Sequence, residues 1–325
     1  MKKRNTYISM LITFLVVSGV FIFLFMFQDK AVIPTATKLI VKNAPPAFSQ
    51  MIYGGFGEDA LNKPMDVTEV NQFIYVTDTN NKRIQVFDLA GSPLYKFGKE
   101  GEGPGQFKFP YGIDGDSQGN IYVSDLYNGC ISIHDSKGNF LRYFAEKDAK
   151  ETVIEAPGIF RIHNDKVYVT DIKKSKVLVF DINGKKLMEI GEPGLKQGQF
   201  RAPNALTVDS DENIYVVDTG NQRVQVFDKE GKFLRIINGA KDQTDTNTVF
   251  VNPRGIGIDS RGIVYVVSNL THIIYGFDKD GKQVFSFGGN GEGNTQFALP
   301  NGLFIDKNDT VYITDASNRR VAVYK

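Results

Sequence analysis

The sequence of 325 residues has few of the side chains on which disulfides, metal sites and nucleic-acid binding depend. It contains one cysteine, Cys130, three histidines and no tryptophan. A single cysteine excludes an internal disulfide, so packing alone must hold the fold together. The charge is nearly balanced, with 38 basic and 37 acidic residues. Because recognition of phosphates requires a basic stripe, this balance argues against nucleic acid as a partner.

The N-terminal part contains a long apolar run. Residues 7–27 include no charged side chain, and these 21 residues would form a helix of about 31 Å, close to the hydrocarbon thickness of a bilayer. Lys2, Lys3 and Arg4 precede the run. We therefore expect a single-pass cell-membrane anchor, with residues 1–6 in the cytoplasm and the rest outside it. The length of the run favours an uncleaved anchor over processing near Ala36.

The segment after the anchor predicts a spacer. Residues 28–47 contain three prolines and show no period, which indicates a semi-extended linker. Without the anchor and its basic tail, 35 basic and 37 acidic residues remain, so the exported part has a net charge of −2. With its single cysteine, this composition suits a bacterial envelope protein.

Beyond the linker, six prolines recur 46, 47, 46, 50 and 47 residues apart. Each proline begins a repeat of the same sequence pattern. The pattern continues to a tyrosine in an apolar run and contains four short segments typical of β-strands. A period of this length with four strands per unit is typical of a β-propeller, in which no unit can bury its faces alone. The prolines are Pro64, Pro110, Pro157, Pro203, Pro253 and Pro300, and the tyrosines are Tyr75, Tyr122, Tyr168, Tyr215, Tyr265 and Tyr312.

The segment that runs from the end of the second strand through the third strand indicates a family. Residues 218–227 read DTGNQRVQVF, and residues 78–87 and 315–324 read DTNNKRIQVF and DASNRRVAVY. These segments resemble the NHL repeat, and the resemblance covers residues 64–325 in six copies. It implies an all-β, six-bladed propeller that binds proteins, peptides, glycans or, in animal relatives, RNA. Some relatives are metal-dependent lyases, but this chain lacks their histidine cluster, so we expect no metal, cofactor or catalytic residue.

The last repeat ends after three strands. Residues 51–55, MIYGG, are similar to the fourth-strand segment 284–289, VFSFGG. We therefore expect residues 49–56 to complete the sixth blade of a propeller that spans residues 48–325, which would remove the open edge.

Several charged residues are expected to be structural. In four repeats an aspartate at the end of the second strand is followed five residues later by a base, across a tight connection. Such pairs should brace the loop and contribute about 0.2 to 1 kcal/mol if exposed. The predicted braces are Asp78 with Arg83, Asp171 with Lys176, Asp218 with Arg223, and Asp315 with Arg320.

Two repeats lack this brace and stand opposite each other in a ring of six. They have Asp125 with Cys130 and Ser268 with Ile273. There are two alternative explanations for the missing brace. One is neutral drift in two degenerate repeats, and the other is that the two loops face a ligand. The topology places the second-to-third-strand loops on the same upper face as the residue that follows each proline. The candidate ligand-binding residues are therefore Met65, Tyr111, Asn204, Arg254 and Asn301 at the channel mouth, with Tyr127, Asn269 and His272 from the two loops.

Deeper in the channel than the residues that follow the prolines, Asp114 and Arg161 lie on neighbouring first strands. They could pair there, most simply as a structural pair.

The leading functional hypothesis is a non-catalytic envelope scaffold or sensor for a protein, peptide or glycan. One alternative is a metal-dependent lactonase- or lyase-like enzyme that uses carboxylates such as Asp66 and Asp114. Another is a subunit of a larger envelope complex.

Overall fold

The computed structural model describes residues 44–145, 153–239 and 247–325. The chain divides into two units, Met1–Ala44 and Pro45–Lys325, and the second contains all the elements described below. The predicted tail (1–6), the predicted membrane span (7–27) and most of the predicted linker (28–47) lie outside the described residues. Within the described ranges, no helix combines the length and apolar character that crossing a bilayer requires.

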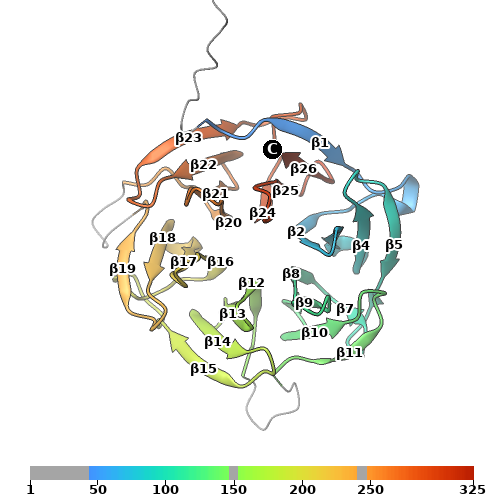
Figure 1. Cartoon of the computed structure of the whole chain (residues 1–325), viewed down its shortest axis with the longest axis horizontal. Coiled ribbons are helices and arrows are strands. Elements are labelled where there is room, and N and C mark those ends of the chain that lie inside the picture. Colours follow the sequence, from blue (N-terminus) through green and yellow to red (C-terminus); the bar gives the residue numbers. More distant parts are fainter. Residues whose placement is uncertain (1–43, 146–152, 240–246) are drawn as a thin grey trace, which may run out of the picture. The chain divides into compact units, whose positions relative to one another are not determined.

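Six antiparallel four-stranded sheets surround a central axis, and Figure 1 shows them as the blades of a ring. The first strand of each blade lies nearest the axis and begins at a repeat proline, where no ladder hydrogen bond is lost. Neighbouring inner strands contact each other around the ring. The inner strands are β2 (Pro64–Val70), β8 (Pro110–Gly115), β12 (Pro157–His163), β16 (Pro203–Val208), β20 (Pro253–Ile258) and β24 (Pro300–Ile305).

The other strands follow outward in chain order. The second strands are β3 (Phe73–Asp78), β9 (Ile121–Asp125), β13 (Lys166–Asp171), β17 (Ile214–Asp218), β21 (Val264–Ser268) and β25 (Val311–Asp315). The third strands are β4 (Arg83–Asp88), β10 (Cys130–His134), β14 (Lys176–Asp181), β18 (Arg223–Phe227), β22 (Ile273–Phe277) and β26 (Arg320–Tyr324). The outer strands of blades one to five are β5 (Pro93–Phe97), β11 (Phe140–Tyr143), β15 (Lys186–Ile190), β19 (Phe233–Ile236) and β23 (Gln283–Gly288).

Short elements fill the connections. A small parallel pair, β6 (Lys99–Glu100) and β7 (Gln106–Phe107), lies between blades one and two. Single 3-10 turns are η1 (Gly57–Asp59), η2 (Thr79–Asn81) and η3 (Thr219–Asn221).

The outer strand of blade six comes from the N-terminal side of the propeller. Strand β1 (Phe48–Ile52) pairs with β26, with Ile52 opposite Val321. Beyond the strand, the backbones of Ala47 and Lys325 exchange two hydrogen bonds of 2.8 Å. All six sheets therefore have four strands, and the chain folds into the all-β, six-bladed propeller that the repeats predict.

The hydrophobic core lies between the faces of adjacent blades. One cluster joins Tyr75 and Ile84 of blade one to Ile113 and Val123 of blade two, and similar clusters fill other blade interfaces. The six repeat tyrosines are all buried in these layers. Each blade buries its apolar faces against the neighbouring blades, so a single blade would leave these faces in water and could not be stable alone.

Three of the four predicted braces form, and none of their side chains is more than 12% exposed. The Arg223 guanidinium lies 2.8 Å from the Asp218 carboxylate and donates to the carbonyls of Lys196 and Gln199 at 2.6 and 2.9 Å. Arg83 with Asp78 and Arg320 with Asp315 repeat the arrangement at 2.7 and 2.9 Å.

The fourth predicted brace, Asp171 with Lys176, is wrong. The Lys176 ammonium instead pairs with Glu189 on β15 at 3.1 Å. Asp171 accepts backbone hydrogen bonds from Glu155 and Lys174. The reason is chemical: a lysine offers one point charge, whereas the arginine fork binds a carboxylate and loop carbonyls together.

Candidate functional site: the pocket at the channel mouth

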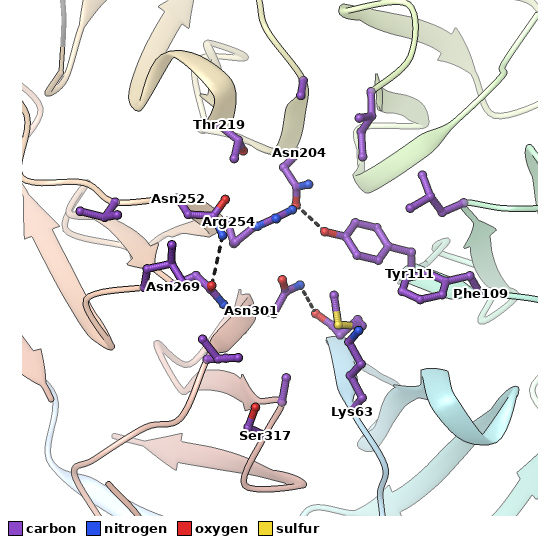
Figure 2. A pocket seen from close by; sticks show the side chains of 18 of the residues that line it. Lys63, Phe109, Tyr111, Asn204, Thr219, Asn252, Arg254, Asn269, Asn301 and Ser317 are labelled. Carbon is purple, nitrogen blue, oxygen red and sulfur yellow. Dashed lines mark hydrogen bonds between the residues drawn. The ribbon is translucent and has the colours of Figure 1, made fainter. Parts of the chain in front are cut away.

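A pocket of about 1190 Å³ opens at one end of the channel, and all six blades contribute to it. Its walls come from the residues around five of the six repeat prolines and from the loops between the second and third strands. The sequence places both groups on one face. Figure 2 shows side chains from different blades converging on this space.

The five candidate residues that follow a proline meet at the floor of this pocket. Met65, Tyr111, Asn204 and Asn301 are largely buried, whereas Arg254 is half-buried. The Asn301 amide donates to the Met65 carbonyl of the next blade at 2.8 Å, which ties blade six to blade one.

Tyr111 spans a whole blade. Its hydroxyl donates to Asn204 Oδ1 at 2.5 Å, which joins blade two to blade four (Figure 2). The intervening blade has Gly158 at the equivalent position. A Cβ there would lie 2.5 Å from the Asn204 carbonyl oxygen and 2.4 Å from Thr170 Oγ1, so glycine lets the inner strands of blades three and four approach each other closely. The buried hydrogen bond fixes the floor, which makes Tyr111 and Asn204 part of the scaffold as well as of the pocket.

Arg254 differs from the other floor residues. Its guanidinium extends into the pocket between Asn204 and Asn252 in Figure 2. The Arg254 guanidinium makes no hydrogen bond and no ion pair with any residue that the structure describes. Nearby amides are occupied with one another, as Asn252 donates to Asn269 at 3.1 Å and Asn269 to the Pro300 carbonyl at 2.8 Å. Arg254 is thus a half-buried cation whose five donors are available to a ligand.

The pocket has a rim that sequence reasoning missed. The residue before the proline lines it in five blades, and four of these residues have a positive φ, at 50° to 57°. A residue before proline normally avoids helical backbone, and a left-handed conformation costs about 1 to 2 kcal/mol. The sequence does mark these rim residues, because each of them comes directly before a repeat proline. The five are Lys63, Phe109, Ala202, Asn252 and Leu299, and all except Phe109 have the positive φ.

Aromatic and cationic groups meet at one side of the rim. The rings of Phe109 and Tyr127 lie 4.6 Å apart, and Tyr127 is 66% exposed. The Lys63 and Lys82 ammonium groups lie 5.5 and 5.8 Å from the centre of the Phe109 ring. The candidate Tyr127 therefore lies beside the pocket as an extension of its edge.

The other two loop candidates have different positions. Asn269 lines the pocket, whereas His272 does not. His272 Nδ1 instead accepts a hydrogen bond from the backbone of Leu299 at 3.2 Å and so supports the rim from behind.

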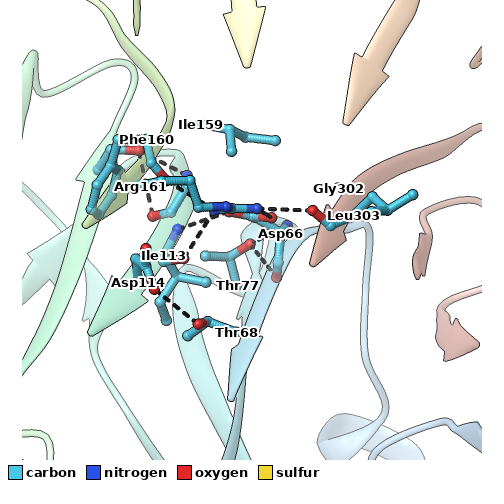
Figure 3. A network of polar contacts seen from close by, with 12 residues as sticks. Asp66, Thr68, Thr77, Ile113, Asp114, Ile159, Phe160, Arg161, Gly302 and Leu303 are labelled. Carbon is cyan, nitrogen blue, oxygen red and sulfur yellow. Dashed lines mark hydrogen bonds and ion pairs between the residues drawn. The ribbon is translucent and has the colours of Figure 1, made fainter. Parts of the chain in front are cut away.

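Deeper in the channel, the predicted pair of Asp114 with Arg161 is replaced by another. Arg161 forms its ion pair with Asp66, at 3.0 and 3.3 Å, and donates to the Leu303 carbonyl at 2.9 Å (Figure 3). Asp114 accepts hydrogen bonds from the Ile162 backbone and Thr68. Arg161 of blade three thus reaches blades one and six, because its long side chain crosses the channel instead of stopping at the neighbouring strand.

The channel carboxylates are buried. Burial raises the pKa of Asp66 and of Asp114, and the nearby Arg161 charge opposes this rise. Both carboxylates are engaged in hydrogen bonds, including one from the Ile113 backbone to Asp66. Within the described ranges, no three or more His, Cys, Asp or Glu side chains are grouped so that they could hold a metal ion.

A family model described as a 6-bladed beta-propeller matches residues 58–147, 142–254 and 243–325. The chain belongs to this family. Protein brain tumor of Drosophila melanogaster is 30% identical over 179 residues, which are 50% of this chain and 17% of that protein. Human NHL repeat-containing protein 3 is 36% identical over 66 residues, 20% of this chain and 19% of that protein. The matches thus cover less than a fifth of these relatives, and they support the NHL assignment.

Solved structures share the fold of this 6-bladed beta-propeller family member at low identity. A gluconolactonase from Xanthomonas campestris is 15% identical with a TM-score of 0.63, over 86% of this chain and 94% of that one. Virginiamycin B lyase from Staphylococcus aureus is 14% identical with a TM-score of 0.58, over 85% of this chain and 98% of that one. At these identities the likeness concerns the fold alone.

Proposed function

We propose that this chain is a membrane-anchored, extracytoplasmic scaffold or sensor that binds a protein, peptide or glycan, without catalysis, in the pocket at the channel mouth. The observation that carries the proposal is the composition of that pocket. Its lining combines amides, aromatic rings and an available arginine on a fixed floor, and none of the described residues that line it is Asp, Glu, His or Cys. Such a surface suits recognition through forked hydrogen bonds and apolar contact.

Rigidity of the floor supports the same proposal. The bonds between Tyr111 and Asn204 and between Asn301 and Met65 join different blades, so a ligand would meet groups that are already in place. Preorganised groups lose little conformational entropy on binding, which raises affinity.

Blocking the pocket tests the proposal. Ser317 lies exposed in the lining, and Ser317→Trp would place a large ring in the cavity. Ser136→Trp adds the same ring to an exposed turn between β10 and β11 and serves as the matched control. We expect full-length protein to bind members of immobilised peptide and glycan arrays, and Ser317→Trp alone to lose this binding. Equal binding by wild type and Ser317→Trp would show that the pocket is not the binding site.

The membrane location is a separate part of the proposal. It rests on the uncharged run of residues 7–27 and on the bases Lys2, Lys3 and Arg4 before it. Alkaline phosphatase fused after Lys325 should be active in bacterial cells, because it needs an oxidising compartment to form its disulfides. A fluorescent protein that matures only in the cytoplasm should stay dark at the same position. The reverse pattern would place the propeller in the cytoplasm.

A further inference from the structure

The charge around the pocket is one-sided. Three cationic side chains line it, Lys63, Arg254 and Arg319, while no acidic side chain does so among the described residues. Lys82 adds a fourth cation close to the edge, over the Phe109 ring. The whole chain, by contrast, is almost neutral. This local excess is therefore a property of the pocket, and it would attract a negative group.

Arg254 is placed to receive that group. It is the half-buried cation of the floor and has no partner among the described residues, whereas the guanidinium groups of the braces are saturated by carboxylates and carbonyls. A guanidinium in this situation matches the geometry of a carboxylate, which accepts two parallel hydrogen bonds.

The rim favours a polypeptide over a sugar as the carrier of the carboxylate. Tyr127, Val251, Leu270 and Leu299 are large apolar side chains around the mouth with exposures of 66%, 43%, 53% and 39%. Sugar recognition relies on aromatic faces and hydroxyl partners, whereas three of these four side chains are aliphatic. Aliphatic rim residues pack well against peptide side chains. On the floor, Asn204 Nδ2 and Asn301 Oδ1 make no hydrogen bond with the described residues and can pair with an extended backbone.

We propose that the pocket binds an extended peptide that inserts a carboxylate toward Arg254 and lays apolar side chains on the rim. The carboxylate is either the C-terminus or an Asp or Glu side chain. This inference rests on the proposed function and adds the chemical class of the ligand to it.

The test uses the full-length chain in detergent and three arrays of random immobilised hexapeptides. One array has free C-terminal carboxylates and lacks Asp and Glu, the second has C-terminal amides and contains Asp and Glu, and the third has amides and lacks both residues. We expect binding on the first or second array, which identifies the source of the carboxylate, and none on the third. Equal binding on all three arrays would overturn the inference while leaving the proposed function in place.

Variants then locate the interaction. Arg254→Gln should weaken binding of the selected peptides by about tenfold or more, because a charge-assisted hydrogen bond is lost. Arg254→Lys should restore part of the affinity, and Arg142→Gln, on the exposed strand β11, should have no effect. Unchanged affinity of Arg254→Gln would refute the role of Arg254. If no peptide binds while acidic oligosaccharides bind in a manner sensitive to Ser317→Trp, the pocket is a glycan site and the peptide inference is wrong. If no peptide and no glycan of the arrays binds, the inference and the proposed function both fail.

Discussion

Replacement of Arg161 by methionine should destabilise the propeller strongly. The Arg161 side chain is 8% exposed and that of Asp66 is fully buried. Removal of one partner of a buried ion pair typically costs about 3 to 5 kcal/mol, because the other charge stays buried without compensation. Asp66 keeps hydrogen bonds from the Ile113 and Val67 backbones, so we expect about 3 kcal/mol. The loss also removes the contact from blade three to the Leu303 carbonyl of blade six.

The pH dependence distinguishes this explanation from simple loss of packing. Arg161 opposes the rise in the pKa of Asp66 that burial causes, so in the variant this pKa rises further above its unfolded value of about 3.9. The folded variant then binds more protons than the unfolded chain. Its stability is therefore greatest below the unfolded pKa and falls as the pH rises through the folded pKa, by up to about 1.4 kcal/mol per pH unit. The cost of Arg161→Met should be larger at pH 8 than at pH 5.

Thermal and urea unfolding at pH 5 and pH 8 measure this difference. Adding Asp66→Asn to Arg161→Met removes the stranded charge and should recover about 1 kcal/mol or more at pH 8. An equal cost at both pH values, together with no recovery in the double variant, would refute the claim that a buried carboxylate causes the loss.

Three further predictions concern other parts of the molecule. Arg223→Met should cost about 3 kcal/mol because its brace with Asp218 is buried, whereas Lys176→Met should cost less than about 1 kcal/mol since its partner is half-exposed, and urea unfolding of both variants compares them. Ile52→Asp places a charge in a fully buried position of β1 and should lower the midpoint of unfolding of the whole ring; a change confined to blade six in hydrogen exchange would contradict cooperative closure. Elemental analysis of the purified full-length chain should find no stoichiometric divalent metal, and a chelator-sensitive ion at one per chain would favour the enzyme alternative.

The regular features of the fold could be read from sequence because they are local and repeated. Every inner strand begins at its repeat proline, and each of the six repeat tyrosines is buried as the pattern requires. The face shared by the residues after the prolines and by the loops also followed from strand order alone. Alternation along a strand and the direction of each connection settle such features before any tertiary detail is known.

The exceptions depend on side-chain reach and on the offset between blades. Arg161 contacts Asp66 and the Leu303 carbonyl because the inner strands converge on one narrow channel, which the repeat period does not reveal. Lys176 turns to Glu189 because a nearby outer-strand carboxylate offers an accessible partner. The pocket rim was missed because residues before proline rarely adopt the positive φ that Lys63 and Leu299 have here.

The pairing of β1 with β26 has a consequence for how the protein is made. Phe48–Ile52 leaves the ribosome before the other strands of the propeller, but Val321, the partner of Ile52, is synthesised roughly 270 residues later. At 5 to 20 residues per second, about 15 to 50 seconds pass during which this segment has no native neighbour. An unpaired β edge can join another chain during that interval, and closing so long a loop is slow. Yield in cells should therefore depend on translation speed and on factors that shield nascent strands, even when the finished ring is stable.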